Sequence, residues 1–124
     1  MQAFDREQIY PLAQALLRAI QAGQPQGLSE FGVSPAIHAE ILEELDIAGE
    51  QAADLTLAPY DKAFQADRSG RVALDLYPLE GEPHTMRVAC QLWSRGRKTD
   101  LTLTADCTRQ QGRAALTFRL LETQ

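Results

Sequence analysis

The fold is decided by the stretch MRVACQLWSRGRKTDLTLTADC, residues 86–107. Apolar and polar residues alternate on both sides of Gly96, which is the pattern of two half-buried antiparallel strands. We expect Gly96-Arg97 to form the two-residue turn between them. A slip of one residue would set apolar side chains against polar ones, so the pattern limits the register to steps of two. The expected pairs are Val88 with Ala105, Cys90 with Leu103 and Leu92 with Leu101 on one face, and Arg87 with Asp106, Gln91 with Thr102 and Trp93 with Asp100 on the other.

The same alternation extends to both neighbours of this hairpin. Strands are expected at about residues 72–79, 85–95, 98–107 and 112–122. A loop at 108–111 would place Leu103 against Leu116, Leu101 against Phe118, Asp100 against Arg119 and Asp106 against Arg113. The result is a curved antiparallel meander of at least four strands with one apolar face. That face would carry Val72, Leu74, Leu76, Val88, Cys90, Leu92, Leu101, Leu103, Leu116, Phe118 and Leu120.

The first part of the sequence predicts two helices. Asp5 followed by Gln8 has the form of a helix start, and apolar residues then recur at helical spacing up to Gly23. Ser34-Pro35 is typical of a cap followed by the first residue of a second helix. The helices are expected at about residues 5–22 and 34–47. They would pack on one face of the sheet, in a single α+β domain over residues 1–124.

Two segments leave the secondary structure open. Pro11 either kinks the first helix or marks a start after Tyr10. Residues 46–67 carry a weaker pattern, with a short strand at 55–57 and a helical turn after Pro59 as the best interpretation. The second helix is expected to bury Ile37, Ile41, Leu42 and Leu45.

Cysteine usage and the N-terminal segment predict a cytoplasmic protein. Cys90 and Cys107 lie about four residues out of alignment across the hairpin, so we expect two reduced thiols in a reducing compartment. Residues 1–5 do not begin a basic and then apolar leader. The apolar stretches also fall short of the ~20 residues that a membrane span needs, so no membrane association is expected.

Catalytic and metal signatures are weak in this sequence. His38 and His84 belong to no spaced ligand set, and no glycine-rich phosphate loop is present, so we expect no metal and no cofactor. The carboxylates Asp75, Asp100 and Asp106 fall on the sheet face opposite the helices, away from any covered pocket. We therefore predict no catalytic residue and favour a protein that is not an enzyme.

The charge is distributed unevenly along the chain. Residues 1–61 hold two bases and ten acids, a net charge of −8, whereas residues 62–124 hold ten bases and seven acids, a net charge of +3. The wet side of the second helix carries acidic residues that would attract a basic partner and repel nucleic acid. The candidate contact residues on that side are Glu40, Glu43, Glu44 and Asp46. A merely solvated helix face is the alternative.

The polar face of the sheet offers a second candidate contact surface. Trp93 would project there with Tyr77 and Asp100, and an aromatic anchor among hydrogen-bonding groups is typical of an interface. Alternatively, Trp93 folds over its own hairpin. The basic turn at 95–98 has too few charges and no interleaved aromatic residues for a nucleic-acid site.

Two resemblances add to these expectations. The hairpin LWSRGRKTDLTL, residues 92–103, is similar to one in small bacterial domains of unknown function, some of which occur as immunity proteins beside secreted toxins. Helices followed by a long curved meander resemble the nuclear transport factor 2-like cone. The first resemblance implies an immunity protein, or antitoxin, that binds and sterically blocks a toxin with a basic contact surface. The second implies a small-ligand-binding protein or an isomerase- or dehydratase-like enzyme, and a homodimer joined through the sheet face is a third alternative.

Overall fold

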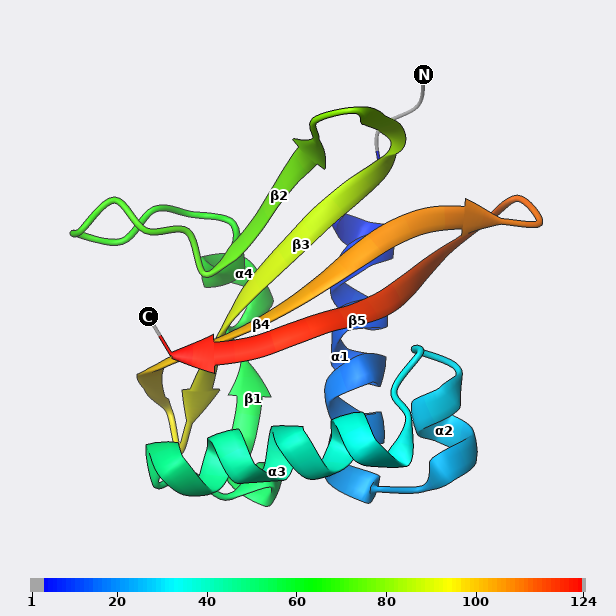
Figure 1. Cartoon of the computed structure of the whole chain (residues 1–124). Helices are drawn as coiled ribbons and strands as arrows, with labels where there is room; N and C mark the ends of the chain where they lie inside the picture. Colours follow the sequence, from blue (N-terminus) through cyan, green and yellow to red (C-terminus); the bar gives the residue numbers. More distant parts are fainter. Residues whose placement is uncertain (1–3, 124) are drawn as a thin grey trace.

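The computed structural model describes residues 4–123 and has the expected α+β architecture, with helices first and a curled antiparallel sheet after them (Figure 1). The helices are α1 (Arg6–Ala22), α2 (Pro25–Ser29), α3 (Pro35–Ala48) and α4 (Tyr60–Ala63), with a 3-10 turn at Ala52–Asp54. The strands are β1 (Leu55–Leu57), β2 (Leu74–Leu79), β3 (Glu82–Ser94), β4 (Arg97–Gln110) and β5 (Arg113–Thr123). No helix within residues 4–123 is long and apolar enough to cross a membrane.

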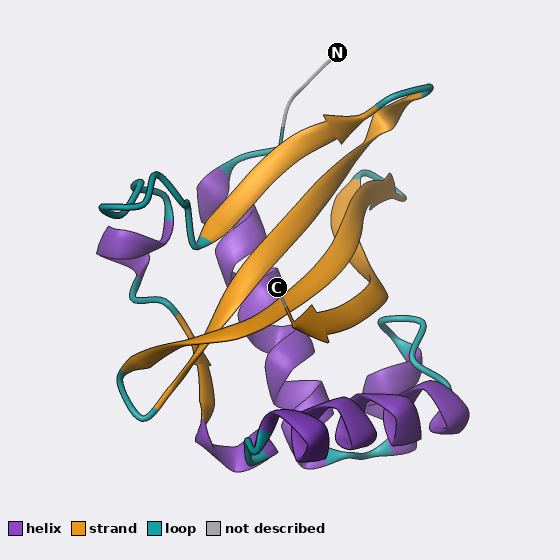
Figure 2. Ribbon diagram, turned by 60° about the vertical axis from the view of Figure 1, so that its left-hand side comes forward, coloured by secondary structure: helices purple, strands orange, loops and turns teal. Residues whose placement is uncertain are grey.

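The sheet has the strand order β1-β3-β4-β5, with β2 also paired to β3 and every pair antiparallel. Its long strands curl around α1, which packs along one face, while α3 lies across the end of the sheet near β5 (Figure 2). Because β5 has a strand neighbour on one side only, it is an edge strand of this sheet.

Both expected helices form, and the segment between them holds a third. In α1 the side chain of Gln8 accepts a hydrogen bond from the Asp5 backbone N–H at 3.2 Å, and the helix continues past Pro11. A start after Tyr10 is therefore wrong. We expected a loop before Ser34, but Pro25 begins the short helix α2, which anchors itself by burying Leu28. A proline after a helix end can also be the first residue of the next helix.

The β3–β4 register is confirmed along most of its length. The pairs that match are Arg87 with Asp106, Val88 with Ala105, Cys90 with Leu103 and Gln91 with Thr102. The expected pairing of Trp93 with Asp100 is wrong, because Trp93 faces Lys98. The turn is Arg95-Gly96, with φ values of 52° and 78°, one residue earlier than expected. A bulge then restores the register, and the Thr99 hydroxyl holds it by donating to the Leu92 carbonyl at 2.7 Å.

The β4–β5 register differs from the expectation by about four residues. Asp106 faces Thr117 instead of Arg113, because β4 runs on to Gln110 and turns at Gln111-Gly112. An even shift leaves every side chain on the same face, so alternation does not detect it. The expected pairs of Leu103 with Leu116, Leu101 with Phe118 and Asp100 with Arg119 are wrong as well. Leu103 faces Leu121 and Leu101 faces Thr123, a shift of five, because a further irregularity adds one residue there.

A second irregularity, between Thr104 and Ala105, changes which leucine of β5 enters the core. Leu121 is 9% exposed and belongs to the core, whereas Leu120, which we expected inside, is 39% exposed. The changed register of β4 and β5 also brings Arg119 to Asp106 on the outer face. Asp106 accepts hydrogen bonds from Arg87 at 2.8 Å and from Arg119 at 2.6 Å, so one carboxylate joins three strands.

Both cysteines are free and buried. Cys90 faces Leu103 and Cys107 faces Met86, which confirms that the two thiols are out of alignment. Burial raises the pKa of Cys90 to about 12 and that of Cys107 to about 11. Since the thiolate is the reactive form, both side chains should be inert in the folded protein.

We therefore expect neither thiol to react with a disulfide reagent at pH 8 faster than the protein unfolds. The measurement is a time course of the thiol that the reagent releases as it reacts with the protein, in buffer and in concentrated urea. Both cysteines should react at once in urea. Rapid reaction of one equivalent in buffer would contradict the burial of that thiol.

Candidate functional site: a groove between α3 and β5

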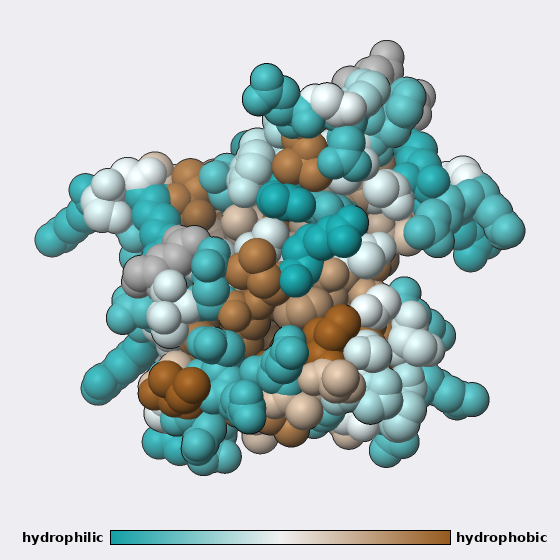
Figure 3. All heavy atoms as spheres, in the orientation of Figure 1, coloured by the Kyte–Doolittle hydropathy of each residue, from teal (hydrophilic) through white to brown (hydrophobic). Residues whose placement is uncertain are grey.

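A surface groove of about 760 Å³ lies between α3 and β5. It is lined by Gly32, Ile37, Glu40, Ile41, Glu43, Glu44, Ile47, Thr117, Phe118, Arg119, Leu120 and Leu121. In Figure 3, which keeps the orientation of Figure 1, the surface is hollowed between these two elements and apolar atoms gather there. The groove joins a helix from the acidic half of the chain to the free edge of the sheet.

The local sequence explains how α3 is held there. The Ser34 hydroxyl accepts a hydrogen bond from the Ile37 N–H at 3.2 Å, and Gly49 ends the helix with a φ of 75°. The loop before α3 is tied to β5, because the Phe118 N–H donates to the Phe31 carbonyl at 2.8 Å. Gly32 has a φ of 73°, and a Cβ there would lie 3.1 Å from the Thr117 methyl carbon. Glycine thus permits the close approach that sets one end of the groove.

The apolar part of the groove is more exposed than the helical pattern predicted. Ile41 and Leu45 are buried as expected, but Leu42, which we expected to be buried, is 45% exposed. Ile47 is 78% exposed and lines the groove with Leu120. The signal for Ile47 was present in the sequence, because an isoleucine stands there on the wet side of an otherwise acidic helix. Exposed apolar side chains beside a groove are typical of protein-binding surfaces.

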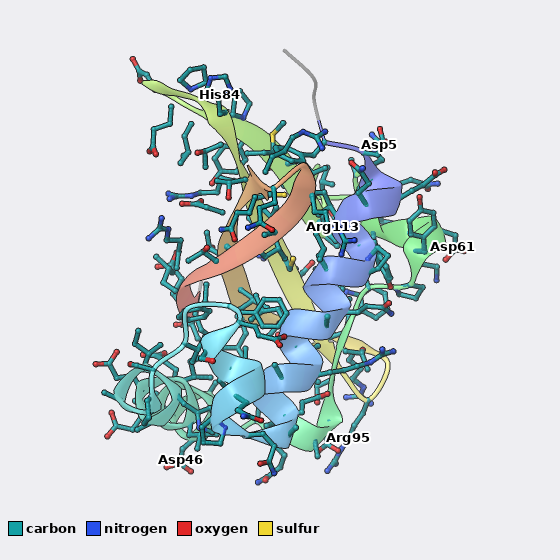
Figure 4. The ribbon with its side chains drawn as sticks, turned by 90° about the vertical axis from the view of Figure 1, so that its right-hand side faces the viewer. Asp5, Asp46, Asp61, His84, Arg95 and Arg113 are labelled. Atoms are coloured by element: carbon teal, nitrogen blue, oxygen red, sulfur yellow. The ribbon has the colours of Figure 1, made fainter. Side chains whose placement is uncertain are left out.

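Acidic side chains dominate the electrostatics of the groove. Glu40, Glu43 and Glu44 line it, and the one basic residue among the described lining residues is Arg119. Arg119 already donates to Asp106, so its charge is partly neutralised from outside the groove. Asp46 is exposed on the same helix but is not one of the lining residues (Figure 4). The structure therefore brings three of the four expected acidic residues to one concave surface.

The three expected contact residues of the sheet face do not gather in the same way. Tyr77 faces Arg87, which is six residues along β3 from Trp93, a separation of roughly 20 Å at the rise of a strand. Asp100 is exposed in the bulge and no longer faces Trp93. Trp93 itself is half-buried. These residues do not form one aromatic anchor with a polar rim.

The arrangement of titratable groups offers little for catalysis. Asp106 is buried; burial raises its pKa, but the hydrogen bonds from Arg87 and Arg119 outweigh that effect and lower it, so the carboxylate stays ionised. His38 lies 3.3 Å from the Ile20 carbonyl, and His84 is exposed at the far end of the molecule (Figure 4). Within residues 4–123, no group of three or more His, Cys, Asp or Glu side chains lies close enough to hold a metal ion.

In the described residues, the sheet face that packs toward the helices is almost wholly apolar, and Ser94, which faces Leu55, is a buried polar residue on it. The buried apolar side chains of this face include Leu74, Val88, Cys90, Leu92, Leu101, Leu103, Ala105, Cys107 and Leu116. The groove is the candidate site on which the structure gathers Glu40, Glu43 and Glu44, the expected contact residues of α3. Comparisons of the chain with models of protein families, with curated proteins and with solved structures gave no match.

Proposed function

We propose that this chain is a protein-binding domain whose groove between α3 and β5 takes a basic and partly apolar surface of a partner protein. The observation that carries the proposal is the combination of Glu40, Glu43 and Glu44 with the exposed side chains of Ile47 and Leu120 in one concavity. Apolar contacts at the centre supply affinity, while acidic groups around them steer a basic partner and select against acidic ones.

We further propose that the partner is a toxin, which the domain neutralises by steric cover as an immunity protein does. The hairpin of residues 92–103, which is similar to that of small bacterial immunity domains, supports this identity of the partner. Steric blocking of a toxin needs no catalytic group in the immunity protein. We place this binding in the cytoplasm of the cell that makes the toxin. The groove alone supports a basic partner of any kind.

Reversing the groove charges with Glu40→Lys, Glu43→Lys and Glu44→Lys should slow association with the partner by about 10- to 100-fold and reduce its dependence on salt. The partner is first captured from a bacterial lysate with the wild-type domain and identified. Its association rate with each variant is then measured by surface plasmon resonance at low and high ionic strength.

A matched control reverses Asp61, Glu80 and Glu82, which are three exposed acidic residues outside the groove lining. This control has the same net charge as the groove variant, so equal slowing in both would place the contact elsewhere. The toxin identity has its own test, because the captured partner should stop growth when expressed alone and the wild-type domain should restore it. A harmless partner would contradict the immunity function and leave the groove result standing.

A further inference from the structure

A second cavity, of about 220 Å³, lies beneath the segment 62–73 on the outer side of the β3–β4 hairpin. It is lined by Lys62, Gln65, Ala66, Asp67, Arg71, Ala73, Gln91, Trp93 and Lys98. Its volume is below the ~300–1,000 Å³ of sites for drug-sized ligands, so it suits a small molecule better than a peptide. None of these residues lines the groove between α3 and β5.

The covering segment is held in place by Asp67. One oxygen of this carboxylate accepts hydrogen bonds from the Ser69 and Arg71 N–H groups at 2.8 and 3.1 Å, and the other accepts from Lys98 at 3.0 Å. The hydrogen bonds from Ser69 and Lys98 hold the pKa of Asp67 well below its usual range. Both oxygens are thus engaged within the chain, and the segment closes on the hairpin as an ordered cover.

The cavity lining is positively charged. It contains Lys62, Arg71 and Lys98 against the single carboxylate of Asp67, a formal net charge of +2. Lys98 is paired with Asp67, and Arg71 donates to the Thr102 hydroxyl at 2.7 Å. The side chain of Lys62, unlike its backbone, makes no hydrogen bond or ion pair with any residue in the described part of the chain. A partly enclosed site with an excess of cations favours an anion, because the attraction is less screened there than on an open surface.

The indole of Trp93 supplies the apolar part of the same wall, together with Ala66 and Ala73. Its Nε1–H is buried and has no hydrogen-bond acceptor among residues 4–123. A buried donor without an acceptor is costly and rare in native structures. Because the Nε1–H is closed off from the cavity as well as from solvent, a ligand in the cavity would contact the ring of Trp93 and not this donor. A planar ring that packs on the indole would match the apolar wall, and an anionic group on that ring would match the cations of the lining.

We propose that this cavity binds a small planar organic carboxylate, with Lys62 pairing with its charge and Trp93 packing against its ring. The site is separate from the groove and does not depend on the protein-binding function. Gln91 contributes to the shape of the floor, since its side chain is fixed by donating to the Thr99 carbonyl at 3.0 Å.

The test uses the single tryptophan of the chain as a reporter. In a ¹H–¹⁵N correlation spectrum the Trp93 indole gives one cross-peak, which should shift saturably as benzoate is added to the full-length protein. Benzamide, which has the same ring without the charge, should bind at least 10-fold more weakly. Inorganic phosphate, which has charge without the ring, should do so as well. Absence of a saturable shift with benzoate, or equal binding of either control, would overturn the proposal.

Lys62→Met should weaken benzoate binding about 10-fold, because it removes the cation and keeps an unbranched side chain of similar length. Arg97→Met is the matched control, since it removes one positive charge from the nearby turn without altering the cavity lining. Unchanged binding by the Lys62 variant, or equal weakening by both variants, would also overturn the proposed site. Backbone amide cross-peaks far from the cavity verify that each variant is folded.

Discussion

Leu121→Ala is expected to lower the free energy of unfolding by about 2–4 kcal/mol, whereas Leu120→Ala should cost less than about 1 kcal/mol. Leu121 is part of the core and faces Leu103 across β4 and β5, so its truncation removes apolar burial and leaves a cavity. Leu120 gives much of its surface to solvent already. The measurement is equilibrium unfolding in urea, with unchanged slopes verifying that each variant still unfolds in a two-state manner.

The comparison tests the irregularity opposite Thr104 and Ala105, where Arg119 of β5 is left without a partner in the β4–β5 pairing. A larger loss for Leu120 than for Leu121 would show that β5 keeps the register of its pair Ala105–Phe118 up to its end, without the irregularity. Leu103→Ala serves as a further control, because Leu103 and Leu121 are in contact across the sheet. Their double variant should lose less than the sum of the two single losses, since neighbouring cavities merge.

The β3–β4 hairpin shows how far alternation alone can predict this fold. Its glycine-containing turn and matched apolar pairs restricted the strands to a register that the structure has from Arg87 to Gln91. The turn was nevertheless placed one residue late. The two residues of the turn, Arg95 and Gly96, both have φ values above zero. The bulge at Thr99 compensates for the one-residue difference between the expected and the observed turn. Alternation indicates which face of the sheet a residue occupies. It cannot reveal a turn that is displaced by one residue when a bulge restores the register after it.

The β4–β5 hairpin shows where the same reasoning fails. The sequence at 108–111 contains polar residues that suit a loop, but they extend the strand to Gln110. Gln111 then takes a φ of 53° beside Gly112, so the glycine marks the turn better than the polar run does. The ion pair of Arg119 with Asp106 follows from that longer strand and was therefore not predicted.

The groove was predicted in part, by its charge and not by its shape. The acidic stretch of α3 indicated a contact surface for a basic partner, and helical spacing placed Glu40, Glu43 and Glu44 on one side. Spacing cannot tell how far a helix stands from an edge strand. The exposure of Leu42 and Ile47 depends on that distance, because α3 packs on the end of the sheet and covers only part of β5.

Asp106→Asn should lower the free energy of unfolding by about 2 kcal/mol at pH 7. The carboxylate is buried, with its side chain 4% exposed, and accepts three charge-assisted hydrogen bonds from Arg87 and Arg119. Both arginines are partly open to water, which limits the cost of leaving them unpaired and places the loss below that of a fully buried pair. Asp54→Asn, which breaks the exposed pair with Arg95, should cost less than about 1 kcal/mol.

The loss should depend on pH in a defined direction. The hydrogen bonds lower the pKa of Asp106 in the folded state below the ~3.9 of an unfolded chain. The stabilisation is therefore fully present above about pH 5 and declines as the pH falls through the folded pKa. Urea unfolding of the wild type and the Asn variant at several pH values should give a constant difference from pH 7 to 5 that shrinks at more acidic pH. A difference that grows on acidification would contradict the ionised state of Asp106.

The same substitution connects the sheet to the groove. Arg119 lines the groove, and Asp106 neutralises it from the opposite side. In the Asn variant the full charge of Arg119 would act on the groove, so a basic partner should associate more slowly although Asp106 is not a lining residue. Asp54→Asn changes the net charge equally and should leave that rate unchanged. Equal rates for both variants would mean that the acidic side chains of α3 act alone, without help from the ion pairs of the sheet.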